Sequence, residues 1–154
     1  MIVITVVFLI IDIVSKILVS NLLEEQVSIN IIHNFFNLTY VKNTGAAWSI
    51  MDDKSYLVLI ISGLIILGLV LYIYKNKSEN KFEKFAYAMI LGGAFGNFVD
   101  RIVYGYVIDF LDFTLFGYSY PIFNFADVFI VLGVIFLIGY TWRCNGDRDR
   151  SNRK

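Results

Sequence analysis

Four long apolar stretches, separated by more polar segments, dominate the hydrophobic pattern of the chain. They cover residues 1–23, 56–74, 85–103 and 121–142, and the second contains no charged residue. A helix needs about 20 apolar residues to cross the hydrocarbon core of a bilayer, and each stretch is close to that length. Because backbone polar groups in lipid must be satisfied within their own segment, we expect helices. The pattern predicts a membrane all-α bundle of four transmembrane helices.

The first stretch has the length of a secretory signal peptide but lacks its other features. No basic residue precedes it, and no small-residue cleavage site follows it. We therefore interpret it as a retained helix, whose short start is compatible with one or two further residues before Met1.

The segment between the first two helices, residues 24–55, has the pattern of a small sheet. Apolar and polar residues alternate over 27–31, which is the period of a strand, and a second run covers 36–42. A turn motif at 43–45 precedes a possible third strand at 46–50. We expect a small antiparallel sheet on the outer membrane surface.

The remaining outer segment, residues 104–120, is aromatic and contains Gly105 and Gly117. We expect a loop with a short helix at the membrane interface.

Orientation of the chain in the membrane follows from lysine and arginine, which are enriched in cytoplasmic loops. Residues 75–84 and the tail 143–154 hold nine of them, and the two outer segments hold two. Both termini are therefore expected in the cytoplasm, with aromatic anchors at the inner interface: Tyr72, Tyr74, Tyr140 and Trp142.

The composition of the 154 residues agrees with a membrane protein. Hydrophobic residues make up 58% and charged residues 17%, whereas soluble domains have about 45–50% and about 25%. This excludes a disordered chain, a basic nucleic-acid-binding domain and a disulfide-rich secreted scaffold. With one cysteine and one histidine, the chain can form neither an internal disulfide nor a His-rich zinc site. We expect no metal, no cofactor and no nucleic-acid partner.

Charged residues within the apolar stretches are costly and mark a site or a buried pair. Asp12 and Lys16 lie four residues apart on one helical face, so they can form an ion pair that holds the first helix, or they can contact a ligand. Asn97 and Arg101 share a face in the same way. Arg101 either extends to the headgroups or holds the ester carbonyls of a lipid-like substrate.

The most informative polar residues are Asp109 and Asp127, at the outer ends of the third and fourth stretches. Two helices that turn back on each other can bring these carboxylates together, where they would share one proton. One could then take a proton from water while the other donates to a substrate carbonyl, as in aspartic proteases. Alternatively, Asn124 caps the fourth helix and Asp127 lies in its first turn. Asp112 is a third acid nearby.

Other catalytic arrangements fit the sequence poorly. Ser15 and Lys16 are neighbours, so in a helix they cannot face each other as a dyad. His33 has no acid or nucleophile near it in sequence and is expected in a strand or turn. Gly92 and Gly96 have the small-x-x-x-small spacing that allows close helix packing, within a lipid-spanning segment where a phosphate loop is not expected.

Five motifs together resemble those of bacterial lipoprotein signal peptidases, also called signal peptidase II. They occur in the order found in that family: DIVSK at 12–16, NTGAAW at 43–48, GGAFGNFVDR at 92–101, VIDF at 107–110 and FNFAD at 123–127. The four-span topology with both termini inside also matches the family.

The resemblance implies an aspartic endopeptidase of the bacterial plasma membrane, without metal or cofactor. Its substrate would be a diacylglyceryl-modified prolipoprotein, cleaved just before the lipidated cysteine. The matching motifs make Asp109 and Asp127 the catalytic pair and Asp12 and Lys16 a structural pair. The segment 24–55 would supply the family's substrate cradle, a β-sheet outside the membrane. The substrate-binding residues would be Asn43, Gly45, Asn97, Arg101 and Asn124.

Two other classes of function remain as alternatives. Intramembrane acids and an Asp–Lys pair also suit a small proton- or cation-coupled carrier, although such a carrier needs polar residues in both halves of the membrane. A non-catalytic assembly factor could use the sheet to bind a partner, and it would tolerate Asp109→Asn. For the peptidase we expect a monomer in contact with membrane lipid.

Overall fold

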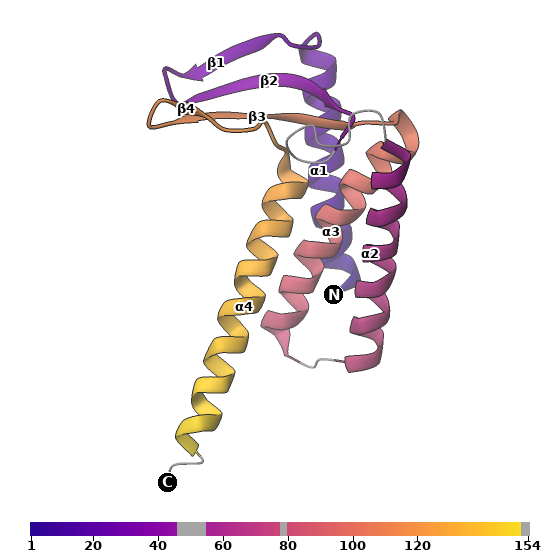
Figure 1. The fold of residues 1–154 in the computed structure, drawn as a ribbon, viewed down its shortest axis with the longest axis vertical. Helices are drawn as coiled ribbons and strands as arrows, with labels where there is room; N and C mark the ends of the chain where they lie inside the picture. Colours follow the sequence, from indigo (N-terminus) through magenta and orange to yellow (C-terminus); the bar gives the residue numbers. More distant parts are fainter. Residues whose placement is uncertain (46–54, 78–79, 152–154) are drawn as a thin grey trace.

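The computed structural model describes residues 1–45, 55–77 and 80–151. Within them the chain forms a helix bundle with a sheet lying across one end (Figure 1). Residue 1 and the last described residues lie toward the opposite end. The elements in chain order are α1 (Ile2–Leu22), β1 (Ser28–Ile32), β2 (Phe36–Asn43), α2 (Ser55–Asn76), α3 (Lys81–Tyr104), β3 (Val107–Leu115), β4 (Tyr118–Ser119) and α4 (Phe125–Ser151).

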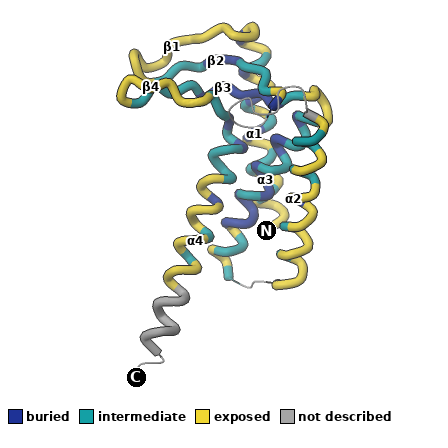
Figure 2. The backbone as a smooth tube through the Cα atoms, in the orientation of Figure 1, coloured by how far each residue is buried: buried dark blue, intermediate teal, exposed yellow. Residues whose placement is uncertain are grey.

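The described residues contain three helices long and apolar enough to cross a membrane, namely α1, α2 and α4 up to Arg143. Much of the exposed surface of α1 and α2 is made of large apolar side chains, as expected of a surface that faces lipid. The third helix, α3, is less apolar and packs against all three others. Figure 2 shows that buried residues concentrate on α3 and where the sheet meets the bundle.

Glycines of α3 let its neighbours approach closely. A Cβ atom at Gly92 would lie 2.6 Å from the Cβ of Phe8 in α1, and one at Gly96 would collide with a carboxyl of α1. Gly93 faces a backbone carbonyl of α4 in the same way. The close packing predicted from the Gly92–Gly96 spacing is therefore confirmed.

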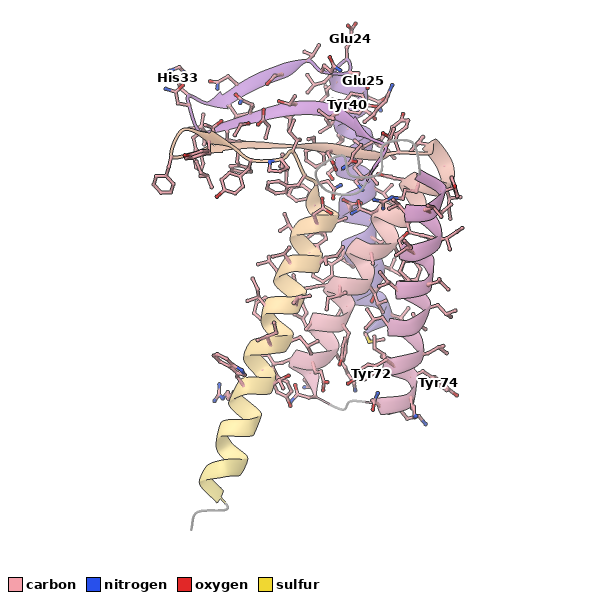
Figure 3. All side chains as sticks on the ribbon, in the orientation of Figure 1. Glu24, Glu25, His33, Tyr40, Tyr72 and Tyr74 are labelled. Atoms are coloured by element: carbon pink, nitrogen blue, oxygen red, sulfur yellow. The ribbon has the colours of Figure 1, made fainter. Side chains whose placement is uncertain are left out.

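The sheet is antiparallel throughout, in the order β1-β2-β3-β4. Two of its strands come from residues 24–55, as predicted, and the third candidate at 46–50 lies outside the described residues. His33 is in the turn between β1 and β2, at the tip of the hairpin farthest from the bundle (Figure 3).

The prediction of a loop with a short helix at residues 104–120 is wrong, because this segment supplies β3 and β4. Gly105 ends α3 in the left-handed conformation, with φ of 79°. Phe116 and Gly117 also have positive φ, of 52° and 81°, and form a two-residue turn. This backbone geometry matches the twist of a tight antiparallel hairpin. Gly105 and Gly117 therefore precede strands β3 and β4 and do not mark a loop with a short helix.

A bulge in β2 determines which of its side chains face β3. Leu38 pairs with Leu111, but Val41, and not Tyr40, pairs with Asp109, so β2 contains one extra residue. The simple alternation expected along residues 36–42 is interrupted at this point. Since one extra residue reverses the faces of a strand, the bulge brings Asn43 to the face that carries Asp109.

The main core of the described residues lies beneath the sheet, where apolar residues of α1 meet β2 and β3. Phe113 stacks on Phe36 and Phe123. Asp109 is therefore flanked in β3 by two residues of this core, Ile108 and Phe110. The buried members of this core are Val19, Leu23, Tyr40, Ile108, Phe110 and Leu111.

Candidate active site

A short backbone pairing connects β3 to the start of α4. The N–H groups of Phe110 and Leu111 donate to the carbonyl of Phe123, at 3.0 and 2.7 Å. The N–H of Phe123 returns a bond of 3.2 Å to the carbonyl of Leu111. This pairing places Asn124, the next residue, against Asp109 of β3.

Asn124 and Asp127 cap the first turn of α4 reciprocally. The Asp127 N–H donates to Asn124 Oδ1 at 3.1 Å, and the Asn124 N–H donates to Asp127 Oδ2 at 3.2 Å. This is a capping box, so the capping interpretation of Asn124 is confirmed. Capping does not prevent Asp127 from belonging to an active site, because its other oxygen, Oδ1, accepts a bond of 2.8 Å from Asn97 Nδ2.

Asp109 is buried between two asparagine amides. Asn124 Nδ2 donates to its Oδ1 at 2.6 Å, and Asn43 Nδ2 donates to its Oδ2 at 2.8 Å. Burial raises the pKa of Asp109 to about 7, and the negative charge of nearby Asp127 contributes to the rise, against the lowering effect of the two amides. A carboxyl with such a pKa can hold a proton near neutral pH.

Lys16 is the buried cation of the site, and its Nζ has three partners. It lies 2.7 Å from Asp12 Oδ2, 2.9 Å from Asp100 Oδ2 and 2.9 Å from Asn97 Oδ1. The predicted Asp12–Lys16 pair is therefore confirmed. Asp100 is a second anionic partner that the sequence did not reveal, since helical spacing indicates contacts within one helix only.

The two carboxylates beside Lys16 also bind backbone groups of other elements. Asp12 accepts a bond of 2.8 Å from the N–H of Ala126 in α4. Asp100 accepts one of 3.1 Å from the N–H of Ile108 in β3. Gly96 leaves the space that the Asp12 carboxyl occupies. One cluster thus connects α1, α3, β3 and α4.

Three further predicted site residues lie next to this network. The Gly45 N–H donates to Asn43 Oδ1 at 3.1 Å, which fixes the orientation of that amide toward Asp109. Arg101 Nη1 donates to the carbonyl of Asn97 at 3.1 Å. The guanidinium of Arg101 is close enough to Asp127 and Asp109 to interact with their charges.

Two residues singled out in the sequence lie apart from the site. Asp112 accepts hydrogen bonds from Thr39 Oγ1 at 2.8 Å and Asn37 Nδ2 at 3.4 Å, within a polar ladder of the sheet. His33 is exposed at the hairpin tip. Within the described residues, no three His, Cys, Asp or Glu side chains are grouped so that they could hold a metal ion.

The fold and the site define a class: a multi-pass membrane protein with two aspartates linked through asparagine amides at one end of its helix bundle. Comparisons with known proteins identify the family within this class. A family model described as signal peptidase (SPase) II matches residues 4–143. The chain belongs to the signal peptidase II family.

Individual relatives agree with this assignment. A lipoprotein signal peptidase of Staphylococcus haemolyticus (strain JCSC1435) is 40% identical over 136 residues, covering 88% of this chain and 86% of that protein. One from Staphylococcus epidermidis (strain ATCC 12228 / FDA PCI 1200) is 41% identical over 134 residues, with coverages of 87% and 83%. A solved structure described as a bacterial membrane enzyme has a TM-score of 0.85 and 37% identity, and covers 99% of this chain and 90% of that chain.

Membership of this family makes the chain a protease, and an aspartic mechanism fits the family. The carrier considered from the sequence is not favoured.

Replacing Lys16 by methionine should destabilise the protein strongly. Asp12 and Asp100 would then be buried without a counter-charge, and breaking a buried pair in this way costs about 3–5 kcal/mol. The matched control is Lys42→Met, because Lys42 pairs with Glu25 at 2.7 Å where both side chains are more than a third exposed, and exposed ion pairs contribute little to stability. Thermal unfolding in detergent measures both, and equal unfolding midpoints would contradict the central role of Lys16.

Proposed function

We propose that the protein is an aspartic endopeptidase that removes the signal peptide from diacylglyceryl-modified prolipoproteins, cutting just before the lipidated cysteine. Asp109 and Asp127 are its catalytic residues. The observation that carries this proposal is that Asn124 binds both of them, so that two carboxyls from distant parts of the sequence form one unit. The names of the relatives support the choice of substrate.

The surroundings of the two carboxyls suggest different roles. Asp127 accepts two hydrogen bonds and lies in the first turn of α4, where the helix dipole favours negative charge. Asp109 is buried and can carry a proton near neutral pH. Ionised Asp127 takes a proton from water, whose oxygen attacks the scissile carbonyl, while Asp109 donates its proton to the carbonyl oxygen. Asp127 then passes the proton it took from water to the amide nitrogen, Asp109 takes back a proton from the gem-diol hydroxyl, and the C–N bond breaks.

The substrate is held by side chains around this pair. Arg101 is the residue we assign to the diacylglyceryl ester carbonyls, because a guanidinium offers several donors and this one lies at the outer end of α3 beside the carboxyls. The sheet forms a cradle for the peptide. The other substrate-binding residues in this proposal are Asn43, Gly45, Asn97 and Asn124.

The location of the site suits such a substrate. Acyl chains anchor a lipidated precursor at the membrane surface, so its scissile bond lies near headgroup depth. The carboxyls lie where the sheet meets the helix ends. We infer one integral-membrane domain in the bacterial plasma membrane. It has four spans, because α3 crosses the membrane in addition to α1, α2 and α4. The sheet end faces outward, both termini are cytoplasmic, and the enzyme works as a monomer.

Asp109→Asn and Asp127→Asn should each abolish cleavage while leaving the protein folded. An amide cannot transfer the proton, and loss of general acid–base catalysis reduces rates by about 10²–10⁴. Asp112→Asn is the matched control, because Asp112 is on the same strand as Asp109 but bonds to Thr39 and Asn37. Gel-shift assays of precursor processing measure the activity. Cleavage by Asp109→Asn at the rate of the control would remove it from the mechanism.

Cleavage should fall as pH rises through about 7, because Asp109 then loses the proton it must donate. Asn43→Leu removes a hydrogen bond that stabilises the charged carboxylate, so it should raise the pKa of Asp109 further and move the falling limb to higher pH. Thr39→Val, on the same strand but bonded to Asp112, should leave the limb unchanged. A limb that moves to lower pH in Asn43→Leu would contradict the assignment of the acid.

Topology can be tested at two described positions at opposite ends of the molecule. In a background with Cys144 replaced by serine, His33→Cys should be labelled in intact cells by an impermeant thiol reagent. Lys77→Cys, in the segment after α2, should react only after permeabilisation. His33 is exposed at the hairpin tip, so a lack of reagent access within the fold cannot explain a negative result. The reverse labelling pattern would place the carboxyls on the wrong side for a secreted precursor.

A further inference from the structure

A groove of about 1030 Å³ opens between α3 and α4 at the end of the bundle away from the sheet. The described residues that line the groove are Asn80, Lys81, Phe82, Phe85, Ile135, Phe136, Gly139, Tyr140 and Arg143. None of them belongs to the candidate active site.

The lining combines apolar walls with two cations. Phe85 packs edge-on against Phe136 across the two helices, at 6.2 Å between ring centroids. Lys81 is the first residue of α3, and Arg143 is the last residue of the apolar span of α4. Both cations are therefore at the depth where a spanning helix leaves the hydrocarbon. No lining residue described here is acidic.

We propose that this groove binds a phospholipid with an anionic headgroup. Its phosphate would lie between Lys81 and Arg143, and an acyl chain would fill the apolar part of the groove. Basic residues near a membrane surface attract anionic lipid with about 1 kcal/mol each, or about fivefold in affinity. The site does not depend on proteolytic activity and is separate from the proposed function.

Charge distinguishes this lipid from the signal peptide, the other long apolar molecule that the proposed enzyme would meet. The amino-terminal region of a signal peptide is positively charged. The groove ends in two cations and would repel it. The N-terminus of α3 contributes little to binding of an anionic headgroup, because the Asn80 side chain already accepts hydrogen bonds from the N–H groups of Phe82 and Glu83. Selectivity for the headgroup therefore rests on Lys81 and Arg143.

Gly139 allows a test that does not disturb packing. A Cβ atom at Gly139 meets nothing within 4 Å, so Gly139→Leu extends into the groove. Gly68→Leu is the matched control: Gly68 is also within an apolar helix with open space around it, but it does not line the groove. Purified full-length protein is mixed with phosphatidylglycerol and phosphatidylcholine of identical chains, and bound lipid is measured by native mass spectrometry.

The wild type and Gly68→Leu should retain phosphatidylglycerol over phosphatidylcholine, and Gly139→Leu should retain neither. The double variant Lys81→Ala, Arg143→Ala should lose the headgroup preference by about thirtyfold, whereas Lys75→Ala, at the end of α2, should keep it. Lipid retention by Gly139→Leu equal to that of its control would overturn the proposal. So would displacement of the lipid by a signal-peptide helix without a lipobox, which would assign the groove to the substrate.

Discussion

The rest of the structure depends on one buried cation, the ammonium group of Lys16, whose side chain is 1% exposed. Removing such a charge from water costs several kcal/mol unless close partners surround it. Those partners come from two helices: Asp12 from α1, and Asn97 and Asp100 from α3. Because the two carboxylates also accept N–H groups of α4 and β3, the same charge fixes where the last helix and the third strand begin.

The cation also determines the geometry of the aspartate pair. An asparagine amide has one acceptor end and one donor end. Lys16 donates to Oδ1 of Asn97, so the Nδ2 of Asn97 must face away from Lys16, toward Asp127. Asn124 also donates to the oxygen of Asn97, and this orients its amide toward Asp109. The buried charge therefore orients Asp109 and Asp127 through the amides of Asn97 and Asn124. Neither of these two aspartates contacts Lys16 directly in this chain of bonds.

The sequence predicted the parts of the fold that follow from local periodicity. Apolar stretches gave the helices, alternation gave β1 and β2, and a four-residue spacing gave the Asp12–Lys16 pair. Contacts between distant segments lie beyond such patterns, so the role of Asp100 and the bulge in β2 were missed. The β3–β4 hairpin was missed because its turn is Phe116-Gly117, without the Asn-Gly or Asp-Gly pair typical of tight turns.

The composition of α3 shows why average hydropathy separates this helix from the other three. Its polar residues near the sheet, Asn97 and Asp100, are buried against other elements. Hydropathy counts such residues against a membrane span, although none of their polar atoms needs to meet lipid. The same helix has Lys81 at its other end, at the groove beside α4. The cost of a polar residue in a bilayer depends on whether its polar atoms meet lipid. In α3 the polar side chains near the sheet bond within the site, and Lys81 lies at the other end of the helix.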